Sequence, residues 1–572
     1  MDILQLHPDD NVALAIRELP AGHVIHTADR SLAIQQTIPA GHKLAVRPIG
    51  RGELALKYGQ PIGRATADIG AGEHAHTHNI ESLRGRGDLA GQPPMPAAAP
   101  ERTIPEGRPV DKCPGLEASA GYTVGESDRL ILKGGFAQPR DQSGGRFSGQ
   151  SSGDPSNLQP PTSNFQSPTS NLQPPTAWSG YRRKDGRVGV RNHVLVLSTV
   201  QCANAVVDRI GRALPQVVAL SHAWGCSQIG DDLAQTRRVL EEFAAHPNVA
   251  AVLLIGLGCE TMPTVEMGEQ LAARGVLVRR LTIQEMGGSR RTFEAGLSVA
   301  RELLQEVSAA RREPIPLSEL IVGLECGGSD AWSGVTANPA VGVASDLIVA
   351  AGGTVILSET PEFIGAEHLF APAPDGRRRS SGGIVRADPE VGRQIVAAVQ
   401  RREADAYRMG VDLRGAQPTP GNIAGGLTTI EEKSLGAIEK GGASPVMEFL
   451  PYAHRPARRG LVVMDTPGND AESVTGMVAG GAQVVVFTTG RGSPLGCPIA
   501  PVIKVASNSA MYRSMAGDLD LDAGTIIEQG ESLAGVGQRI FDQIIAVANG
   551  QQTAAETWGS NEFAINVIGP RM

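Results

Sequence analysis

The sequence predicts an α/β protein built from a small N-terminal all-β domain, a disordered linker and two α/β blocks with mostly parallel sheets. Its 572 residues are too many for one hydrophobic core. A Pro-, Gly- and Ser-rich stretch separates two regions of ordinary composition. From Trp178 onward, apolar strand-like runs alternate with amphipathic helical stretches. We therefore expect parts at residues 1–82, 83–177, 178–315 and 316–572.

Composition and charge favour a role with small molecules. Hydrophobic residues make up 41% of the chain, whereas 52 basic and 60 acidic residues give a net charge of −8. This balance gives no electrostatic reason to expect nucleic acid or an anionic membrane as a partner. The N-terminus lacks a basic region followed by an apolar core, and no apolar run is long enough to cross a bilayer. We expect a cytoplasmic protein.

The first 82 residues contain an internal echo: LPAGHVI, IPAGHKL and IGAGEHA each place Ala-Gly before a short β-type run. This pattern predicts a small β domain of hairpins. The domain closes with GEHAHTHNI, in which His74, His76 and His78 alternate and would share one face of an extended segment. Imidazoles on one face can bind a divalent metal or transfer protons. The alternative is a solvated polar edge.

Residues 83–177 are predicted to be a disordered linker with polyproline character. Pro, Gly, Ser, Gln and Arg dominate, and a seven-residue repeat, SNLQPPT SNFQSPT SNLQPPT, fills residues 156–176. Such a segment buries too little apolar area to offset its chain entropy. The Arg-Gly-Asp triplet in RGRGD (84–88) is interpreted as chance, and Cys113 has no predicted function.

The remainder of the chain predicts parallel sheets covered by helices. Strands are expected at 193–199, 216–221, 249–258, 275–281, 320–326 and 353–359, with helices over 232–246 and 290–312. Prolines at 312–318 indicate a boundary between the two blocks.

A strand, crossover and strand are expected within 461–508, where two apolar runs end in polar and Gly residues. Ligand-handling side chains collect where strands of open α/β sheets end. The residues selected on this ground are Asp465, Thr488, Thr489, Arg491, Ser493 and Cys497. Arg491, on an open Gly-rich backbone, suits a substrate carboxylate.

Five of the six cysteines follow predicted strands in Gly-flanked turns, with His222 and Glu260 nearby in sequence. They are Cys202, Cys226, Cys259, Cys326 and Cys497. No C-x-x-C spacing occurs, which disfavours a zinc knuckle or a disulfide framework. Five thiols at one sheet edge would favour a metal, a cluster or nucleophilic chemistry. The alternative is that small thiols simply fill tight turns.

Several long strings resemble the altronate dehydratase and galactarate dehydratase family. They are DNVALAI, AGEHAHTHNI, GYRRKDGRVGVRNHVLVLSTVQCAN, GLGCE, ECGGSDAWSGVTANPAVG, EKSLGAIEKGG and the whole stretch from MDTPGND to KVASNS. The resemblance implies an SAF-type domain at 1–82 and a catalytic part from about 178 to 572, with a longer linker than in the family. It also implies hydro-lyase activity on a sugar acid with a divalent metal, Fe²⁺ or Mn²⁺; an iron–sulfur cluster is less favoured.

Such a dehydratase removes a weakly acidic proton α to a carboxylate and expels the β-hydroxyl, so a cation and an Arg would stabilise the anionic intermediate. The predicted catalytic residues are His76, His78, Glu260 and Lys433. The predicted metal ligands are His76, His78, His222, Cys226 and Cys326. The predicted substrate-binding residues are Asp465, Thr488, Thr489, Arg491 and Ser493.

Three functional hypotheses follow. The leading one is conversion of altronate to 2-dehydro-3-deoxygluconate and water in hexuronate catabolism. Within the enzyme class, galactarate dehydration or an iron–sulfur hydroxyacid or sulfonate lyase is the alternative. The third hypothesis is a non-catalytic sugar-acid binding protein. In each case the predicted partner is a small molecule. The sequence leaves open whether the chain forms a homo-oligomer.

Overall fold

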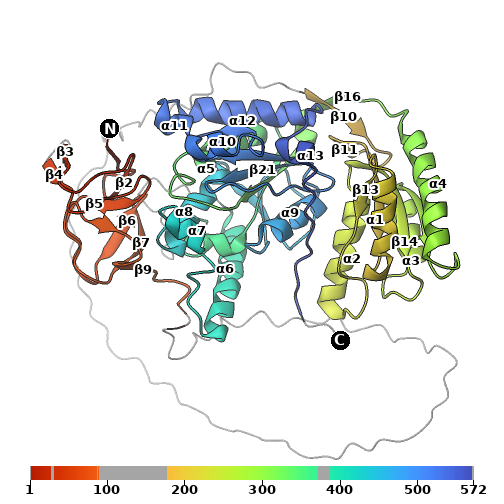
Figure 1. Cartoon of the computed structure of the whole chain (residues 1–572), viewed down its shortest axis with the longest axis horizontal. Helices are drawn as coiled ribbons and strands as arrows, with labels where there is room; N and C mark the ends of the chain where they lie inside the picture. Colours follow the sequence, from red (N-terminus) through yellow and green to blue (C-terminus); the bar gives the residue numbers. More distant parts are fainter. Residues whose placement is uncertain (1, 27–30, 87, 89–176, 371–386, 570–572) are drawn as a thin grey trace, which may run out of the picture. The chain divides into compact units, whose positions relative to one another are not determined.

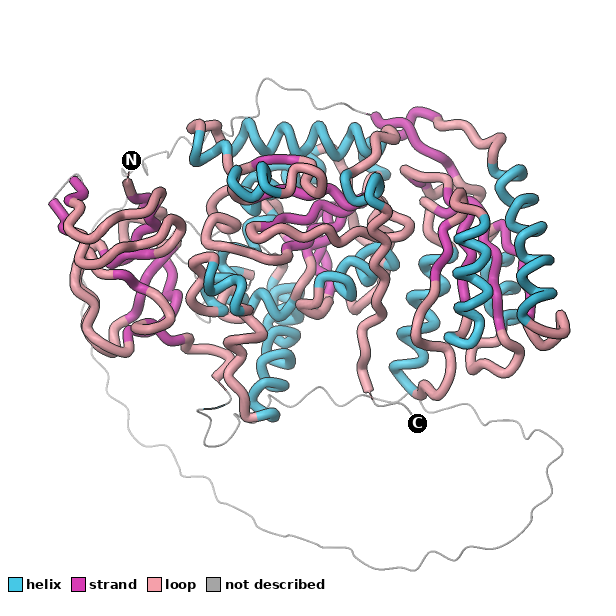
Figure 2. The backbone as a smooth tube through the Cα atoms, in the orientation of Figure 1, coloured by secondary structure: helices cyan, strands magenta, loops and turns pink. Residues whose placement is uncertain are grey.

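The computed structural model describes residues 2–26, 31–86, 88, 177–370 and 387–569 (Figure 1). Most of the predicted linker, with Cys113, lies outside these residues. The described chain has the predicted class: a β-rich N-terminal domain followed by α/β regions with parallel sheets (Figure 2). None of the described helices combines the length and the apolar character that a membrane span requires.

The N-terminal domain consists of short antiparallel strands in two sheets, β1-β2-β5-β8 and β6-β7-β9, with a separate β3-β4 hairpin. The repeated Ala-Gly turns explain this construction, because Gly22, Gly41 and Gly72 have φ values of 81°, 81° and 86°, which favour glycine. The strands are β1 (Ile3–Leu4), β2 (Val12–Ala15), β3 (Val24–His26), β4 (Ser31–Ala33), β5 (Lys43–Ala45), β6 (Leu54–Lys57), β7 (Gln60–Ala65), β8 (His74–Ala75) and β9 (Ile80–Glu81).

The first α/β region is a four-stranded parallel sheet with helices on both faces. Its elements are β12 (His193–Ser198), α1 (Asn204–Ala213), β13 (Val218–Leu220), α2 (Gly230–Ala244), β14 (Val249–Gly256), α3 (Thr264–Ala273), β15 (Leu277–Thr282) and α4 (Ser289–Val307). Val194 and Val196 share a core with α1 and α4. Leu195 and Leu197 point the other way, into a core with α2 and α3.

The proline-containing stretch at 312–318 is more regular than expected. Glu313–Pro316 forms β16, which pairs antiparallel with β10 (Ala177–Arg182), and β10 also pairs with β11 (Val188–Gly189). Proline is tolerated in β16 because an edge strand can leave N–H positions unused. This small sheet ties the start of the α/β part to the end of its first region.

The second α/β region contains a seven-stranded, entirely parallel sheet in the order β19-β20-β18-β17-β21-β22-β23. Its strands are β17 (Ile321–Cys326), β18 (Thr354–Leu357), β19 (Val446–Leu450), β20 (Gly460–Met464), β21 (Val484–Thr489), β22 (Val502–Ala506) and β23 (Leu521–Asp522). The central strands are apolar along their whole length because both faces are covered.

Helices α5 (Ala337–Ala350) and α12 (Leu533–Ala548) share a core with one face of this sheet, whereas α9 (Asp470–Ala479) shares a core with the other. The remaining helices are α6 (Pro389–Met409), α7 (Pro420–Ala424), α8 (Ile430–Ala437), α10 (Ser509–Ser514), α11 (Thr525–Glu528) and α13 (Ala554–Trp558).

Both parallel sheets are doubly wound, and each has one point at which the strand order reverses. In the seven-stranded sheet the chain moves outward from β17 through β18 on one side and from β21 through β22 on the other. In the four-stranded sheet the same reversal falls between β12 and β14. Loops at the carboxyl ends of such neighbouring strands diverge and leave a crevice that binds ligands.

Candidate active site

Three histidines of the N-terminal domain form a compact cluster. One ligand atom from each of His42, His74 and His76 lies within 4.8 Å of the others. The His42 and His74 rings are brought together because β5 pairs with β8, where Leu44 lies opposite His74. The ring centroids of His42 and His76 are 4.8 Å apart. Three imidazole nitrogens at this spacing can hold one divalent metal.

The cluster differs from the predicted strip in its geometry. The extended segment ends at Ala75, and the carbonyl of His76 accepts hydrogen bonds from the Asn79 and Ile80 N–H groups in a turn. His78 is exposed, and its ring centroid lies 5.2 Å from that of His74. Sequence reasoning missed His42, although the repeated Ala-Gly-His of the internal echo was a signal for it.

The clustered imidazoles are neutral at neutral pH. Burial, reinforced by neighbouring histidines and Lys43, lowers the pKa of His74 to about 4 and that of His76 to about 3. Burial and the charge of Lys43 also lower the pKa of His42. His76 Nδ1 lies 3.1 Å from Thr428 Oγ1, which orients the ring and leaves the other nitrogen to act as a ligand. Neutral, oriented imidazoles fit a metal site.

Buried ion pairs dock the N-terminal domain onto α8. Lys43 Nζ lies 2.9 Å from Glu432 Oε2 and donates to the Gly426 carbonyl at 2.7 Å. Lys57 Nζ pairs with the other oxygen of Glu432 at 2.8 Å. Burial alone would raise the pKa of Glu432, but the two ammonium groups outweigh it and lower the pKa to about 2. The N-terminal domain is thereby anchored at Glu432, the residue that precedes Lys433.

A second anchor uses the stretch that contains the Arg-Gly-Asp triplet. Arg84 pairs with Glu367 and Glu403 at 2.7 Å each, and Arg86 pairs with Asp88 at 2.9 Å. The first residues of the predicted linker are therefore part of the docking contact.

A buried cluster of carboxylates, a thiol and two lysines lies where β17 and β18 end. Lys440 Nζ lies 2.6 Å from Cys326 Sγ and 2.8 Å from Glu359 Oε2. Lys433 Nζ contacts Glu362 Oε1 at 2.5 Å, and Cys326 Sγ lies 3.2 Å from Glu362 Oε2. The predicted ligand Cys326 does form a metal-sized group with Glu359 and Glu362, but Lys433 and Lys440 between them contact all three of these side chains.

The same cluster holds acids that favour the protonated form. Burial, together with the neighbouring Glu359, raises the pKa of Glu325 and Glu362 above the ordinary range. Burial and the charge of Glu362 raise the pKa of Asp470 to about 6. Neither Glu325 Oε1 nor Glu359 Oε1 has a hydrogen-bond partner. Burial would lower the pKa of Lys433, but the nearby acids raise it, so this side chain stays an ammonium.

Asp470, the first residue of α9, and Arg491, in the loop after β21, both approach the segment Gly327–Gly328 that follows β17. A Cβ atom on Gly327 would lie 2.1 Å from Asp470 Oδ2, so only glycine permits this approach. The N–H of Arg491 donates to the Gly328 carbonyl at 2.8 Å. Arg491 is exposed and has no ion-pair partner among the described residues, which leaves its guanidinium for an anionic ligand.

Other predicted substrate residues are engaged within the protein. Asp465 pairs with Arg402 at 3.1 Å and accepts from Thr360 Oγ1 at 2.9 Å, so it ties β20 to α6. Thr488 Oγ1 donates to Asn338 Oδ1 at 2.6 Å. Thr489 Oγ1 accepts from the Gly492 N–H at 3.0 Å and shapes the Arg491 loop. Ser493 is half-buried in that loop.

A loop between α7 and α8 connects the histidines with the strand ends. Thr428 contacts His76, the Gly425 carbonyl accepts from the Ala331 N–H at 2.9 Å, and Asn422 Nδ2 donates to the Ser329 carbonyl at 2.8 Å. Ser329 and Ala331 follow Cys326 directly in the loop after β17. The histidine cluster and the loop after β17, which begins at the carboxylate cluster, therefore both contact residues 422–428.

The remaining predicted residues lie elsewhere. Glu260, His222 and Cys226 follow strands of the four-stranded sheet, and none belongs to a metal-sized group in the described structure. Both nitrogens of His222 contact backbone, Nε2 the Ser198 carbonyl at 2.7 Å and Nδ1 the Trp224 N–H at 3.1 Å. Glu260 accepts from Thr264 Oγ1 and Gly258 N–H. The five thiols divide between two sheets, so no single edge gathers them; Cys497 is buried in the core.

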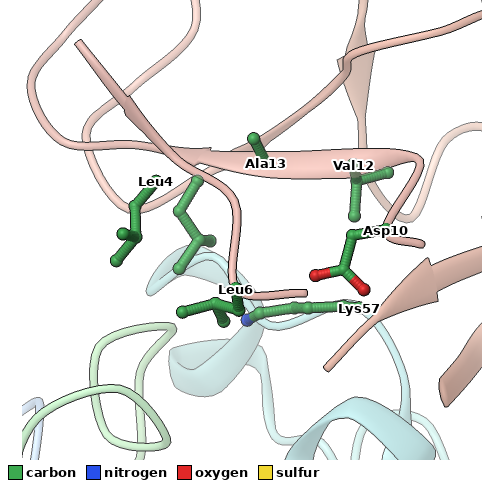
Figure 3. Close-up of a pocket in the computed structure, with 7 residues that line it drawn as sticks. Leu4, Leu6, Asp10, Val12, Ala13 and Lys57 are labelled. Atoms are coloured by element: carbon green, nitrogen blue, oxygen red, sulfur yellow. The ribbon is translucent and has the colours of Figure 1, made fainter. Parts of the chain in front are cut away.

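A small pocket in the N-terminal domain is unsuited to a sugar acid (Figure 3). Most of its lining is aliphatic, and its polar groups are committed: Lys57 pairs with Glu432, and Asp10 accepts from Gly59 N–H at 2.8 Å. Its lining residues are Leu4, Leu6, Asp10, Val12, Ala13, Leu14 and Lys57.

Comparison with known proteins agrees with this arrangement. Three family models match in succession: "Altronate/galactarate dehydratase SAF domain" over residues 1–83, "D-galactarate dehydratase/Altronate hydrolase, second domain" over 180–308, and "D-galactarate/Altronate dehydratase, C-terminal" over 317–570. The three matches together identify the class of the protein as a dehydratase-type lyase. The chain belongs to the D-galactarate/altronate dehydratase family.

Individual relatives support the same assignment. Altronate dehydratase of Bacillus subtilis is 32% identical, and 98% of each chain is covered. Altronate dehydratase of Escherichia coli is 33% identical, and 99% of each chain is covered. The beta subunit of (2R)-sulfolactate sulfo-lyase from Chromohalobacter salexigens is 38% identical over 389 residues, which cover 68% of this chain and 96% of that subunit. The alpha subunit matches over 91 residues, 15% of this chain and 97% of that subunit, at 35% identity.

Proposed function

We propose that this protein is a metal-dependent dehydratase that converts altronate to 2-dehydro-3-deoxygluconate and water in hexuronate catabolism. The observation that supports this most is the docking of the domain that carries a neutral three-histidine cluster onto α8, the helix that contains Lys433. The full-length similarity to two altronate dehydratases points to the substrate.

The metal is assigned to His42, His74 and His76. The carboxylate cluster is a weaker choice because Lys433 and Lys440 already contact Glu362 and Glu359. Imidazole ligands suit Fe²⁺, and Mn²⁺ is the second metal considered. When bound, the ion supplies Lewis-acid stabilisation of negative charge on the substrate.

The chain's own groups would carry the remaining steps. Arg491 binds the substrate carboxylate through its open guanidinium. His78, exposed and with its ring tilted against that of His74, accepts the α proton and passes it to solvent. Asp470, which burial keeps protonated to about pH 6, donates a proton to the departing β-hydroxyl. The Lys433 ammonium stabilises the anionic intermediate. Glu260, His222 and Cys226 have no role in this proposal.

The test is formation of a 2-keto-3-deoxy acid by purified protein across a panel of hexonates and hexarates, with and without a chelator. We expect turnover of altronate that disappears with the chelator and returns with ferrous or manganous ion. Binding of altronate without any keto-acid product would instead support the non-catalytic hypothesis.

Two other substrates belong in the same panel. Galactarate is included because the family models name both activities. A sulfonated hydroxyacid is included because the sulfo-lyase beta subunit is 38% identical to this chain. Release of sulfite rather than water from that substrate would reassign the reaction.

A further inference from the structure

Three cysteines surround the strand reversal of the four-stranded sheet, outside the site described above. Cys202 follows β12, Cys226 follows β13 and Cys259 follows β14, and all three side chains are exposed free thiols. Because β12, β13 and β14 are parallel neighbours, their carboxyl ends lie at one edge. The carboxyl edge of this sheet, where doubly wound sheets bind ligands, therefore carries three thiols.

Direct hydrogen bonds hold the three cysteine loops together. Gln201 N–H, beside Cys202, donates to the Trp224 carbonyl at 2.8 Å. Thr261, two residues after Cys259, donates to the Gly225 carbonyl from both its N–H (3.2 Å) and its hydroxyl (2.8 Å). Each thiol thus lies within two residues of a hydrogen bond to a neighbouring cysteine loop. These hydrogen bonds fix the three loops relative to one another.

Local backbone and side chains support the same geometry. Gly225 (φ 100°) and Gly258 (φ 121°), each adjacent to one of the cysteines, adopt conformations that favour glycine. His222 uses both ring nitrogens to fix the turn that leads to Cys226, through contacts with Ser198 and Trp224. The predicted metal ligand His222 is in this view a positioning residue.

The electrostatic surroundings favour bound anionic sulfur. Cys202 lies immediately before α1, Cys226 precedes α2, and Cys259 precedes α3. The amino ends of three helices of 10, 15 and 10 residues therefore lie at this edge, where their dipoles stabilise negative charge.

We propose that Cys202, Cys226 and Cys259 hold an iron–sulfur cluster of the four-iron type. A single tetrahedral zinc requires sulfur atoms about 3.8 Å apart, given Zn–S bonds of about 2.3 Å. In the described structure the three sulfurs are not among the groups whose ligand atoms all lie within 4.8 Å, so they do not form a ready tetrahedral site for one metal ion. A four-iron cluster binds each cysteine sulfur to a separate iron atom and so holds the sulfurs farther apart. With three protein thiolates, the fourth iron is open to water or an oxygen ligand. This site is independent of the proposed function.

The test is anaerobic reconstitution of the full chain with ferrous iron and sulfide. We expect about four acid-labile sulfide ions and about five iron ions per chain, four in the cluster and one at the histidines, with broad visible absorption. The triple variant Cys202→Ser/Cys226→Ser/Cys259→Ser should lose the sulfide and the absorption, and each single variant should reduce them. Circular dichroism of the single variants shows whether they fold.

Two matched variants separate this site from others. Cys497→Ser, at a thiol of the other sheet, and His76→Ala, in the histidine cluster, should retain the full sulfide content. Absence of labile sulfide in the wild type, equal sulfide in the triple variant, or uptake of one zinc without sulfide would each overturn the proposal.

Discussion

At the residue scale, the site depends on groups whose protonation is set by burial. The histidines of the cluster are neutral, Lys433 is charged, and Asp470 titrates near neutrality. These states follow from contacts that no local pattern encodes: His42 reaches His74 across a strand pair, and Lys433 meets Glu362 from 71 positions away. The sequence could predict the residue types but not these pairings.

His78 is expected to transfer a proton without holding the metal. His78→Gln should therefore lower kcat on altronate by about 10²- to 10⁴-fold while the metal content per chain stays unchanged. The exposed His26 on β3 offers a matched control, since His26→Gln should alter neither quantity. Loss of metal in step with activity would show instead that His78 is a ligand.

Asp470 should leave a signature in the pH dependence of stability. Its pKa is raised from 3.8 to about 6 in the fold, so its contribution is complete below about pH 4 and is lost as the pH rises through about 6. The decline amounts to at most about 3 kcal/mol in the free energy of unfolding, and Asp470→Asn should abolish it. Urea titrations of the chelated protein between pH 4 and 6.5 measure it; identical profiles would contradict the assignment.

At the scale of elements, periodicity predicted most of the α/β part. The apolar runs at 193–199, 249–258 and 320–326 correspond to β12, β14 and β17. Strands that are covered on both faces are apolar along their length, so the sequence alone indicates them. The strip 74–78 was predicted as one extended face, but a turn follows Ala75. The prolines of β16 indicate an interruption, and the sequence gives no local sign of the strand because its pairing partner β10 lies more than 130 residues earlier.

The contact between the N-terminal domain and α8 depends on Glu432. Glu432→Gln should cost about 3–5 kcal/mol in the free energy of unfolding at pH 7, because it leaves two buried ammonium groups unpaired. Hydrogen exchange should rise in β5, β8 and α8. The triple replacement Lys43→Met/Lys57→Met/Glu432→Leu is the control, since it removes all three charges and should restore most of the stability. Equal stability of wild type and Glu432→Gln would contradict the docking model.

At the scale of the whole molecule, the chain joins two parts that bind each other through their own surfaces. Lys43, Lys57 and Arg84 pair with residues beyond position 360, and the described parts before and after the linker form one compact unit. In the sulfo-lyase relative, the matched segments of 91 and 389 residues belong to separate subunits. The tandem repeat at 156–176 is thus expected to tether rather than to build the site.

Division of the chain tests this organisation. Residues 1–88 and 177–572, expressed together as separate polypeptides, should copurify and form keto acid from altronate at a rate close to that of the intact chain. Glu432→Gln in the larger piece should weaken their association. Two pieces that remain separate at micromolar concentration would show that the linker is required for docking.

The location of the metal is the claim on which the account depends, and anomalous diffraction measures it directly. Crystals of the intact chain, loaded with Mn²⁺ and soaked with altronate, should give a manganese peak bonded to His42, His74 and His76, with the substrate carboxylate against Arg491. A manganese peak at the carboxylates around Glu359, with the three histidines bare, would contradict the account.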